Sequence, residues 1–115
     1  MEIKEYKKYN EEEIMALYLS VGWSAYTNNP SLLKQGFENS LLVLAAYEDS
    51  ELVGIIRVVG DGYTVILIQD LLVSLNMQSQ GVGKALLNAV LNKYSDVRQI
   101  ELVTDNIPKN LLFYT

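Results

Sequence analysis

Apolar residues in the first third of the chain recur at helical spacing in two segments. Residues 11–21 carry apolar side chains about one turn apart, and Asn10 stands before a run of glutamates, as a capping residue does. Gly22 is expected to end this helix, because glycine is favoured just after the last helical residue. A shorter helix is predicted to open at Asn29-Pro30, since proline is favoured in the first turn.

Three apolar runs follow from residue 41, and short polar turns separate them. Turns such as Gly60-Asp61-Gly62, placed between runs rich in β-branched residues, are typical of antiparallel strands with tight connections. The last run is largely apolar, which predicts a strand covered on both faces. The predicted strands cover residues 41–47, 52–59 and 63–73.

The remainder of the chain alternates between helix and strand. A polar loop leads into a helical stripe over residues 81–94, and a further strand is predicted at 99–103. A strand followed by a helix and another strand implies a parallel pair joined by a crossover. Pro108 would open a last helix over 109–115. We therefore predict one α/β domain over the whole chain, with a mixed, mainly antiparallel central sheet and helices on both faces.

The amino-acid composition excludes several kinds of catalytic and metal site. The chain has 115 residues and contains neither cysteine nor histidine, which excludes disulfides, thiol nucleophiles, Ser-His pairs and Cys/His metal sites. Its net charge of −5 argues against general affinity for nucleic acid or anionic membranes. It slightly favours a cationic or amine partner, although a solvated acidic surface is the simpler explanation. No membrane-spanning run and no signal peptide are recognised, so a cytoplasmic protein is expected.

The loop before the helix predicted over 81–94 has the composition of an anion site. It reads Gln78-Ser79-Gln80-Gly81-Val82-Gly83-Lys84. A strand that runs through a glycine-bearing loop into a helix directs backbone N–H groups and the positive helix end at one point, which suits a pyrophosphate. The pattern is neither a P-loop nor a dinucleotide fingerprint, because Ala85 and Leu86 occupy required positions. On spacing alone, a tight strand-to-helix turn explains the glycines equally well.

The loop resembles motif A of the GNAT superfamily of N-acetyltransferases, Q/R-x-x-G-x-G/A. Gln78, Gly81 and Gly83 match its required positions. The preceding Leu71-Leu72-Val73 resembles the strand and bulge of that family, and Thr104-Asp105-Asn106 and Phe113-Tyr114 resemble its later elements. The order of elements agrees over nearly the whole chain.

The resemblance implies acetyl-CoA as donor and a role for each matching residue. The backbone of the loop would hold the pyrophosphate, and that of Leu71, Leu72 and Val73 would hold the pantetheine arm. The N–H of Leu72 would polarise the thioester carbonyl. Tyr114 would protonate the departing thiolate of CoA, although a packing role on the sheet is the alternative. The donor-binding residues expected are Leu71, Leu72, Val73, Gln78, Ser79, Gln80, Gly81, Val82, Gly83, Lys84 and either Asn106 or Asn110.

The general base and the acceptor pocket are less defined. Leu67 stands where some histone acetyltransferases of the family carry a glutamate, so Asp70, acting through water, is the candidate. Its alternative is a strand-end carboxylate that faces solvent. Trp23 and Tyr26 would form an amine-binding wall by stacking or cation–π contact, or would pack in the core.

Family members usually continue past this point with two more strands, whereas this chain stops at Thr115. The resemblance therefore implies a domain that is incomplete at its C-terminus, with the strand at 99–103 open to a partner such as a second copy of the chain. The expected function is transfer of an acetyl group from acetyl-CoA to a small-molecule or peptide amine by direct attack through a tetrahedral intermediate. The alternatives are a CoA-binding module without catalysis and an anion-sensing interaction domain.

Overall fold

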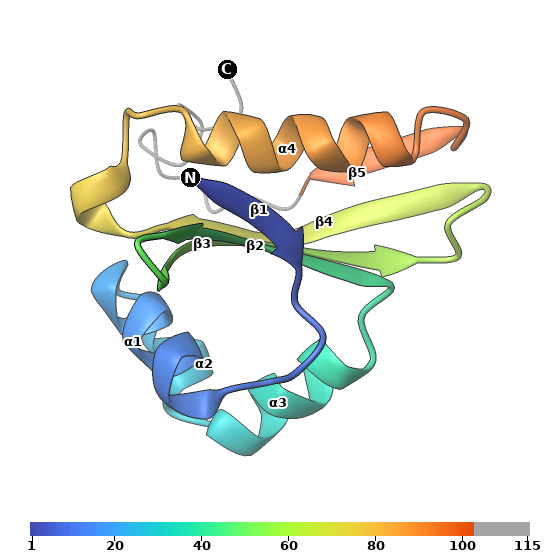
Figure 1. The fold of residues 1–115 in the computed structure, drawn as a ribbon. Coiled ribbons are helices and arrows are strands. Elements are labelled where there is room, and N and C mark those ends of the chain that lie inside the picture. Colours follow the sequence, from blue (N-terminus) through green and yellow to red (C-terminus); the bar gives the residue numbers. More distant parts are fainter. Residues whose placement is uncertain (103–115) are drawn as a thin grey trace.

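The computed structural model describes residues 1–102. The five strands form one sheet in the order β1-β2-β3-β4-β5, antiparallel except for the parallel pair β4–β5. Helices cover both faces, with α1, α2 and α3 on one side and α4 on the other (Figure 1). The elements are β1 (Glu2–Glu5), α1 (Glu11–Ser20), α2 (Ser24–Thr27), α3 (Pro30–Glu38), β2 (Leu42–Glu48), β3 (Glu51–Gly60), β4 (Val65–Val73), the 3-10 turn η1 (Leu75–Met77), α4 (Val82–Lys93) and β5 (Gln99–Leu102).

This architecture confirms the predicted mixed, mainly antiparallel sheet and its parallel strand pair. Three short elements were not predicted: β1, α2 and η1. The sequence of β1, Glu-Ile-Lys-Glu, has a single apolar residue, and the strand exists because Ile3 lies opposite Ala46 on β2. The helix predicted over 109–115 lies outside the described residues.

Each face of the sheet has its own apolar core. The α4 face buries Ile66, Ile68, Leu71, Val73, Val82, Leu86 and Val90 together with residues of β2 and β3, and the opposite face buries Ile14, Leu17, Tyr18, Leu33, Phe37, Val43, Ile55 and Leu72. Burying a side chain of this size contributes roughly 1.5–3 kcal/mol relative to leaving it exposed. The two cores therefore hold both helical layers firmly against β4.

The helix ends follow the predicted chemistry. Asn10 and Asn29 cap α1 and α3, because their side chains accept hydrogen bonds from the N–H groups of Glu13 (3.3 Å) and Leu32 (3.4 Å). Gly22 follows α1 with a φ of 77°, a conformation that glycine adopts without strain. No helix within residues 1–102 is long and apolar enough to cross a membrane.

A bulge interrupts the pairing of β3 with β4. Arg57 lies opposite Asp70, whereas its neighbour Val58 lies opposite Ile68, so Gln69 is an extra residue on β4. The bulge changes the alternation of side chains along β4. Before it Ile68 faces α4, and after it Leu71 faces α4, so Asp70 and Leu72 are turned toward α1–α3.

Candidate functional site

The loop between β4 and α4 is held at both ends by its own chain. The N–H of Ser74 donates to the carbonyl of Val53 on β3 (2.8 Å), and Nε2 of Gln78 donates to the carbonyl of Val73 (3.0 Å). The Gln78 side chain therefore points back to the end of the strand and closes the loop. Ser79 and Gly81 then take the left-handed conformation, with φ of 68° and 84°, and turn the chain into the helix.

The first turn of α4 leaves backbone donors without a partner inside the helix. The N–H of Ala85 bonds to the carbonyl of Gly81 (2.9 Å), so those of Val82, Gly83 and Lys84 have no carbonyl within the helix. No side chain caps this end, unlike α1 and α3. A Cβ on Gly81 would meet no atom within 4 Å, so the space beside this backbone is open. The predicted anion cradle is thus compatible with a phosphate group.

The direction of the N–H groups on β4 bears on the polarising role predicted for Leu72. Residues along an antiparallel ladder alternate between donating to one neighbour and pointing away from it. Since the Ser74 N–H bonds to β3, the N–H of Leu72 points to β3 as well, opposite Ile55. The N–H groups of Leu71 and Val73 point to the other side, where the described pairing with β5 ends at Ile68. This direction argues against Leu72 as the polarising donor and leaves the N–H of Leu71 pointing away from β3.

Asp70 is not a strand-end carboxylate facing solvent. Its residue is 1 % exposed, and its Oδ2 accepts hydrogen bonds from Nε of Arg57 (2.7 Å) and from the hydroxyl of Tyr18 (2.9 Å). Accepting a proton would break this ion pair and leave the buried guanidinium without its counter-ion. The structure therefore argues against Asp70 as the general base.

The neighbours of Asp70 respond to the same burial and charge. Burial raises the pKa of the Tyr18 hydroxyl well above its ordinary value, and the negative charge of Asp70 raises it further. Burial alone would lower the pKa of Arg57, but the Asp70 carboxylate outweighs it and raises that pKa above its ordinary value. Arg57 is thus charged and Tyr18 is neutral at physiological pH.

The two predicted acceptor aromatics lie beside this pair. The rings of Trp23 and Tyr26 pack against each other with centroids 6.1 Å apart, and both contact the edge-on ring of Tyr18. The hydroxyl of Tyr26 also accepts a hydrogen bond from Nε2 of Gln69, the bulged residue (3.3 Å). Both aromatics are half-buried, so they belong to the core and at the same time border the bulge.

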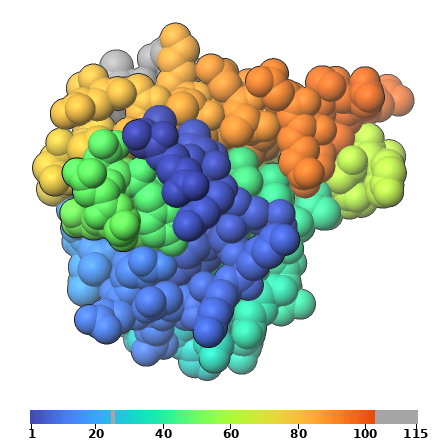
Figure 2. Space-filling view, in the orientation of Figure 1, coloured from blue at the N-terminus to red at the C-terminus, as the bar shows by residue number. Residues whose placement is uncertain are grey.

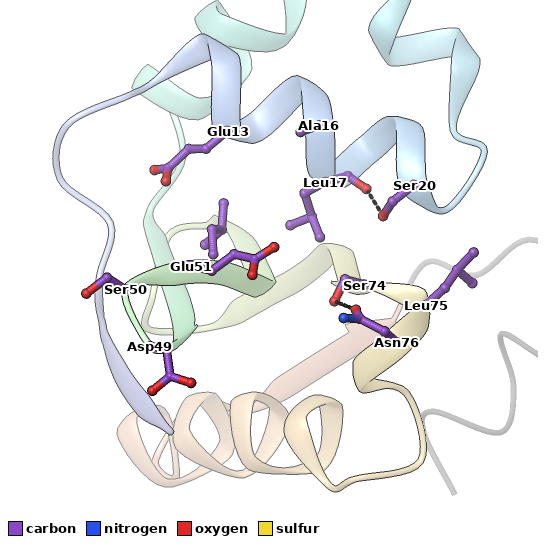
Figure 3. A pocket seen from close by; sticks show the side chains of 11 residues that line it. Glu13, Ala16, Leu17, Ser20, Asp49, Ser50, Glu51, Ser74, Leu75 and Asn76 are labelled. Atoms are coloured by element: carbon purple, nitrogen blue, oxygen red, sulfur yellow. Dashed lines mark hydrogen bonds between the residues drawn. The ribbon is translucent and has the colours of Figure 1, made fainter.

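A cleft of about 590 Å³ opens near the end of β4 on the α1 side of the sheet. Figure 3 shows α1 on one side of it and the β2–β3 turn and η1 on the other. In Figure 2 the green atoms of that turn lie between the yellow region around residue 75 and the blue atoms of the N-terminal third. Among the described residues, three carboxylates and no basic side chain line the cleft. The lining residues include Glu13, Ala16, Leu17, Ser20, Asp49, Glu51, Leu52, Ser74, Leu75 and Asn76.

The structure brings the donor-loop residues and the strand residues Leu71 and Val73 to one end of the sheet. Asn106, Asn110 and Tyr114 lie outside the described residues. Sequence reasoning missed Tyr18, Arg57 and Gln69. Arg57 and Asp70 each interrupt an apolar strand. Two opposite charges in neighbouring buried strands are a signal from which the ion pair could have been predicted.

Comparisons with known proteins agree with this geometry. The family model of the acetyltransferase (GNAT) domain matches residues 5–115. A GNAT-family acetyltransferase of Streptococcus pneumoniae is 34 % identical, with a TM-score of 0.84 over 98 % of this chain and 82 % of that one. A probable acetyltransferase of methicillin-resistant Staphylococcus aureus is 26 % identical, with a TM-score of 0.79 over 98 % and 86 %.

An aminoglycoside 6'-N-acetyltransferase complexed with coenzyme A shares the fold, with 22 % identity and a TM-score of 0.78 over 93 % of this chain and 63 % of that one. Among curated proteins, none matches the sequence. The family model covers almost the whole chain, and the acetyltransferase of Streptococcus pneumoniae shares its fold at 34 % identity. The chain therefore belongs to the GNAT family of acetyltransferases.

Proposed function

We propose that this protein transfers the acetyl group of acetyl-CoA to a primary amine. The observation that supports it best is the juxtaposition of the N-terminus of α4, which has no side-chain cap within residues 1–102, with the N–H groups of β4 that point away from β3. The N–H groups of Val82, Gly83 and Lys84 would hold the pyrophosphate, and those of Leu71 and Val73 would bind the pantetheine arm. Acetyl-CoA supplies an activated acyl group, and no covalent bond to the protein is needed.

The transfer balances without a further reactant. The amine nitrogen forms a bond to the acetyl carbon, the carbon–sulfur bond breaks, the amine loses a proton and the thiolate gains one. The N–H of Leu71 would stabilise the negative charge that develops on the carbonyl oxygen. Tyr114 remains the proposed donor of the proton to sulfur. We assign no general base, because Asp70 is engaged with Arg57.

Thiol release from acetyl-CoA, followed across a panel of amines, tests this function. The wild type is expected to release thiol with at least one amine, and Tyr114→Phe is expected to lower kcat by at least about tenfold, since general acid catalysis contributes 10²–10⁴-fold. Calorimetry with CoA should give the same affinity for both proteins. Binding without turnover for any amine would favour a CoA-binding module, and no binding at millimolar CoA would exclude both functions.

We propose further that the acceptor is positively charged. The cleft beside the end of β4 carries Glu13, Asp49 and Glu51. The Glu13 carboxylate is fixed by hydroxyl donors from Tyr6 (2.6 Å) and Tyr47 (3.3 Å), so its charge has a defined place. A cleft lined by one sign of charge attracts a ligand of the opposite sign. The net charge of −5 acts in the same direction.

Glu51→Lys is expected to raise KM for a diamine or polyamine acceptor by about threefold or more, while KM for an uncharged aromatic amine stays unchanged. The difference should shrink at high salt, where exposed charges are screened. Glu38→Lys is the matched control, because Glu38 is equally exposed and lies on α3, outside the cleft. Equal effects of the two substitutions would refute the role of the cleft. A homodimer through the edge of β5, the absence of nucleic-acid and membrane partners, and a cytoplasmic location remain predictions.

A further inference from the structure

Two opposite charges are buried in the middle of the sheet. Arg57 and Asp70 are the charged residues within 1–102 that are buried, with 7 % and 1 % of their surfaces exposed. Removing two charges from water costs several kcal/mol per ion, so such a pair often stabilises a fold less than apolar side chains of the same size would. The ion pair is therefore better explained as a device that selects one arrangement of the strands than as a source of stability for the fold.

The pair spans the bulge of β4. Arg57 and Asp70 lie directly opposite each other, on the residue pair where the register changes. Arg57 is fixed from the other side by α3 and the residues just after it. Its guanidinium lies 5.7 Å from the ring centroid of Phe37 on α3, and Nη1 donates to the hydroxyl of Ser40 (3.4 Å). Tyr18 of α1 fixes the carboxylate. Both partners of the pair are thus anchored to the helical layer that covers this face.

A pairing of β3 with β4 that lacks the bulge is the alternative register with which the observed one competes. If β4 continued in phase from Ile68, Asp70 would lie opposite Ile56 and face the apolar core under α4, while Arg57 stayed on the opposite face. Leu71 would then lie opposite Ile55, and its N–H would point to β3 instead of away from it. This register would bury an unpaired carboxylate among apolar side chains, which is strongly unfavourable.

We propose that Arg57 and Asp70 are positioning residues that select the bulged register and thereby direct the N–H of Leu71 away from β3. This inference rests on the proposed function, in which that N–H polarises the acetyl carbonyl. Neither residue touches the reacting atoms, and their effect on the reaction passes through the backbone of the bulge. The charge of the pair thus determines which face of β4 each residue after Gln69 presents.

A variant that replaces the whole polar group by apolar side chains tests the inference. Tyr18→Phe/Arg57→Met/Asp70→Leu leaves no buried charge and allows both registers, so it is expected to fold with a melting temperature close to or above that of the wild type. Its kcat should fall by at least about tenfold, as for loss of an oxyanion donor, while the affinity for CoA changes by less than about threefold. NMR contacts between the backbones of β3 and β4 should show a population in which Leu71, instead of Leu72, lies opposite Ile55.

Leu33→Ala is the matched control, because Leu33 is buried on α3 and lies outside the ion pair. It is expected to lower stability and leave kcat within about twofold of the wild type, as expected for a large-to-small core substitution. If the triple variant does not fold, Arg57→Gln/Asp70→Asn, which removes both charges and leaves no buried ion without its partner, provides the same readouts, with a loss in kcat of at least about threefold expected from the weaker register preference.

Wild-type kcat together with the cross-strand contacts of the bulged register alone, in either folded variant, would overturn the inference. A changed register with unchanged kcat would also overturn it, because the register would then not matter for the reaction. If the wild type neither binds CoA nor releases thiol, the proposed function fails. The cross-strand contacts alone then decide whether the pair selects the register, so the two failures are distinguishable.

Discussion

Gly83→Glu is expected to weaken CoA binding by at least about 100-fold, which corresponds to roughly 2.8 kcal/mol. Gly83 is buried in the first turn of α4, among the N–H groups that have no carbonyl partner inside the helix. A glutamate side chain adds bulk at this point, and its negative charge repels the pyrophosphate that the positive helix end would attract. Isothermal calorimetry with CoA measures the affinity directly.

Asn88→Glu is the control for this substitution. Asn88 is exposed on the same helix, more than one turn beyond the uncapped end, so it adds the same charge at a distance from the loop. The dipole effect acts within the first turn, and the control is therefore expected to bind CoA as the wild type does. If Gly83→Glu folds and retains its affinity, the loop is not the donor site.

The donor loop could be predicted because its chemistry is local. Gly81 and the residues around it determine the strand-to-helix turn. Gly81 adopts a left-handed φ of 84°, which a glycine can take without support from distant segments. The caps at Asn10 and Asn29 were predictable for the same reason, since each side chain bonds to a backbone group three residues later.

The strand β4, which carries Leu71 and Asp70, could be predicted only in part. Its apolar pattern located it, but the bulge depends on the register with β3, which lies far away in the sequence. That single extra residue turns Asp70 inward to Arg57, and it directs the N–H of Leu72 rather than that of Leu71 at β3. Neither placement follows from the residue pattern of β4 alone. Side-chain alternation with a period of two makes every such assignment sensitive to one residue.

Packing between α4 and β3 also determines where the donor loop sits. Gly54 on β3 lies under the first turn of α4, and a Cβ at this position would stand 2.9 Å from Cγ1 of Val82 and 3.1 Å from Cδ1 of Leu86. It would also stand 3.3 Å from the carbonyl oxygen of Leu72. Valine is stiff about χ1, so Val82 cannot turn away easily. The absence of a side chain at Gly54 therefore allows the helix to approach the sheet closely.

Gly54→Ala is accordingly expected to destabilise the protein by about 1–3 kcal/mol, as overpacking of a core does, and to weaken CoA binding, because the first turn of α4 must move outward with the loop. Urea denaturation gives the first quantity and calorimetry the second. Val82→Ala in the same chain removes the closest clashing atom and should restore much of both losses, whereas Val82→Ala alone should only destabilise. Because the two residues touch, their effects should not add. Additive losses would mean that α4 is positioned independently of Gly54, and that the loop owes its place to the hydrogen bonds of Ser74 and Gln78 instead.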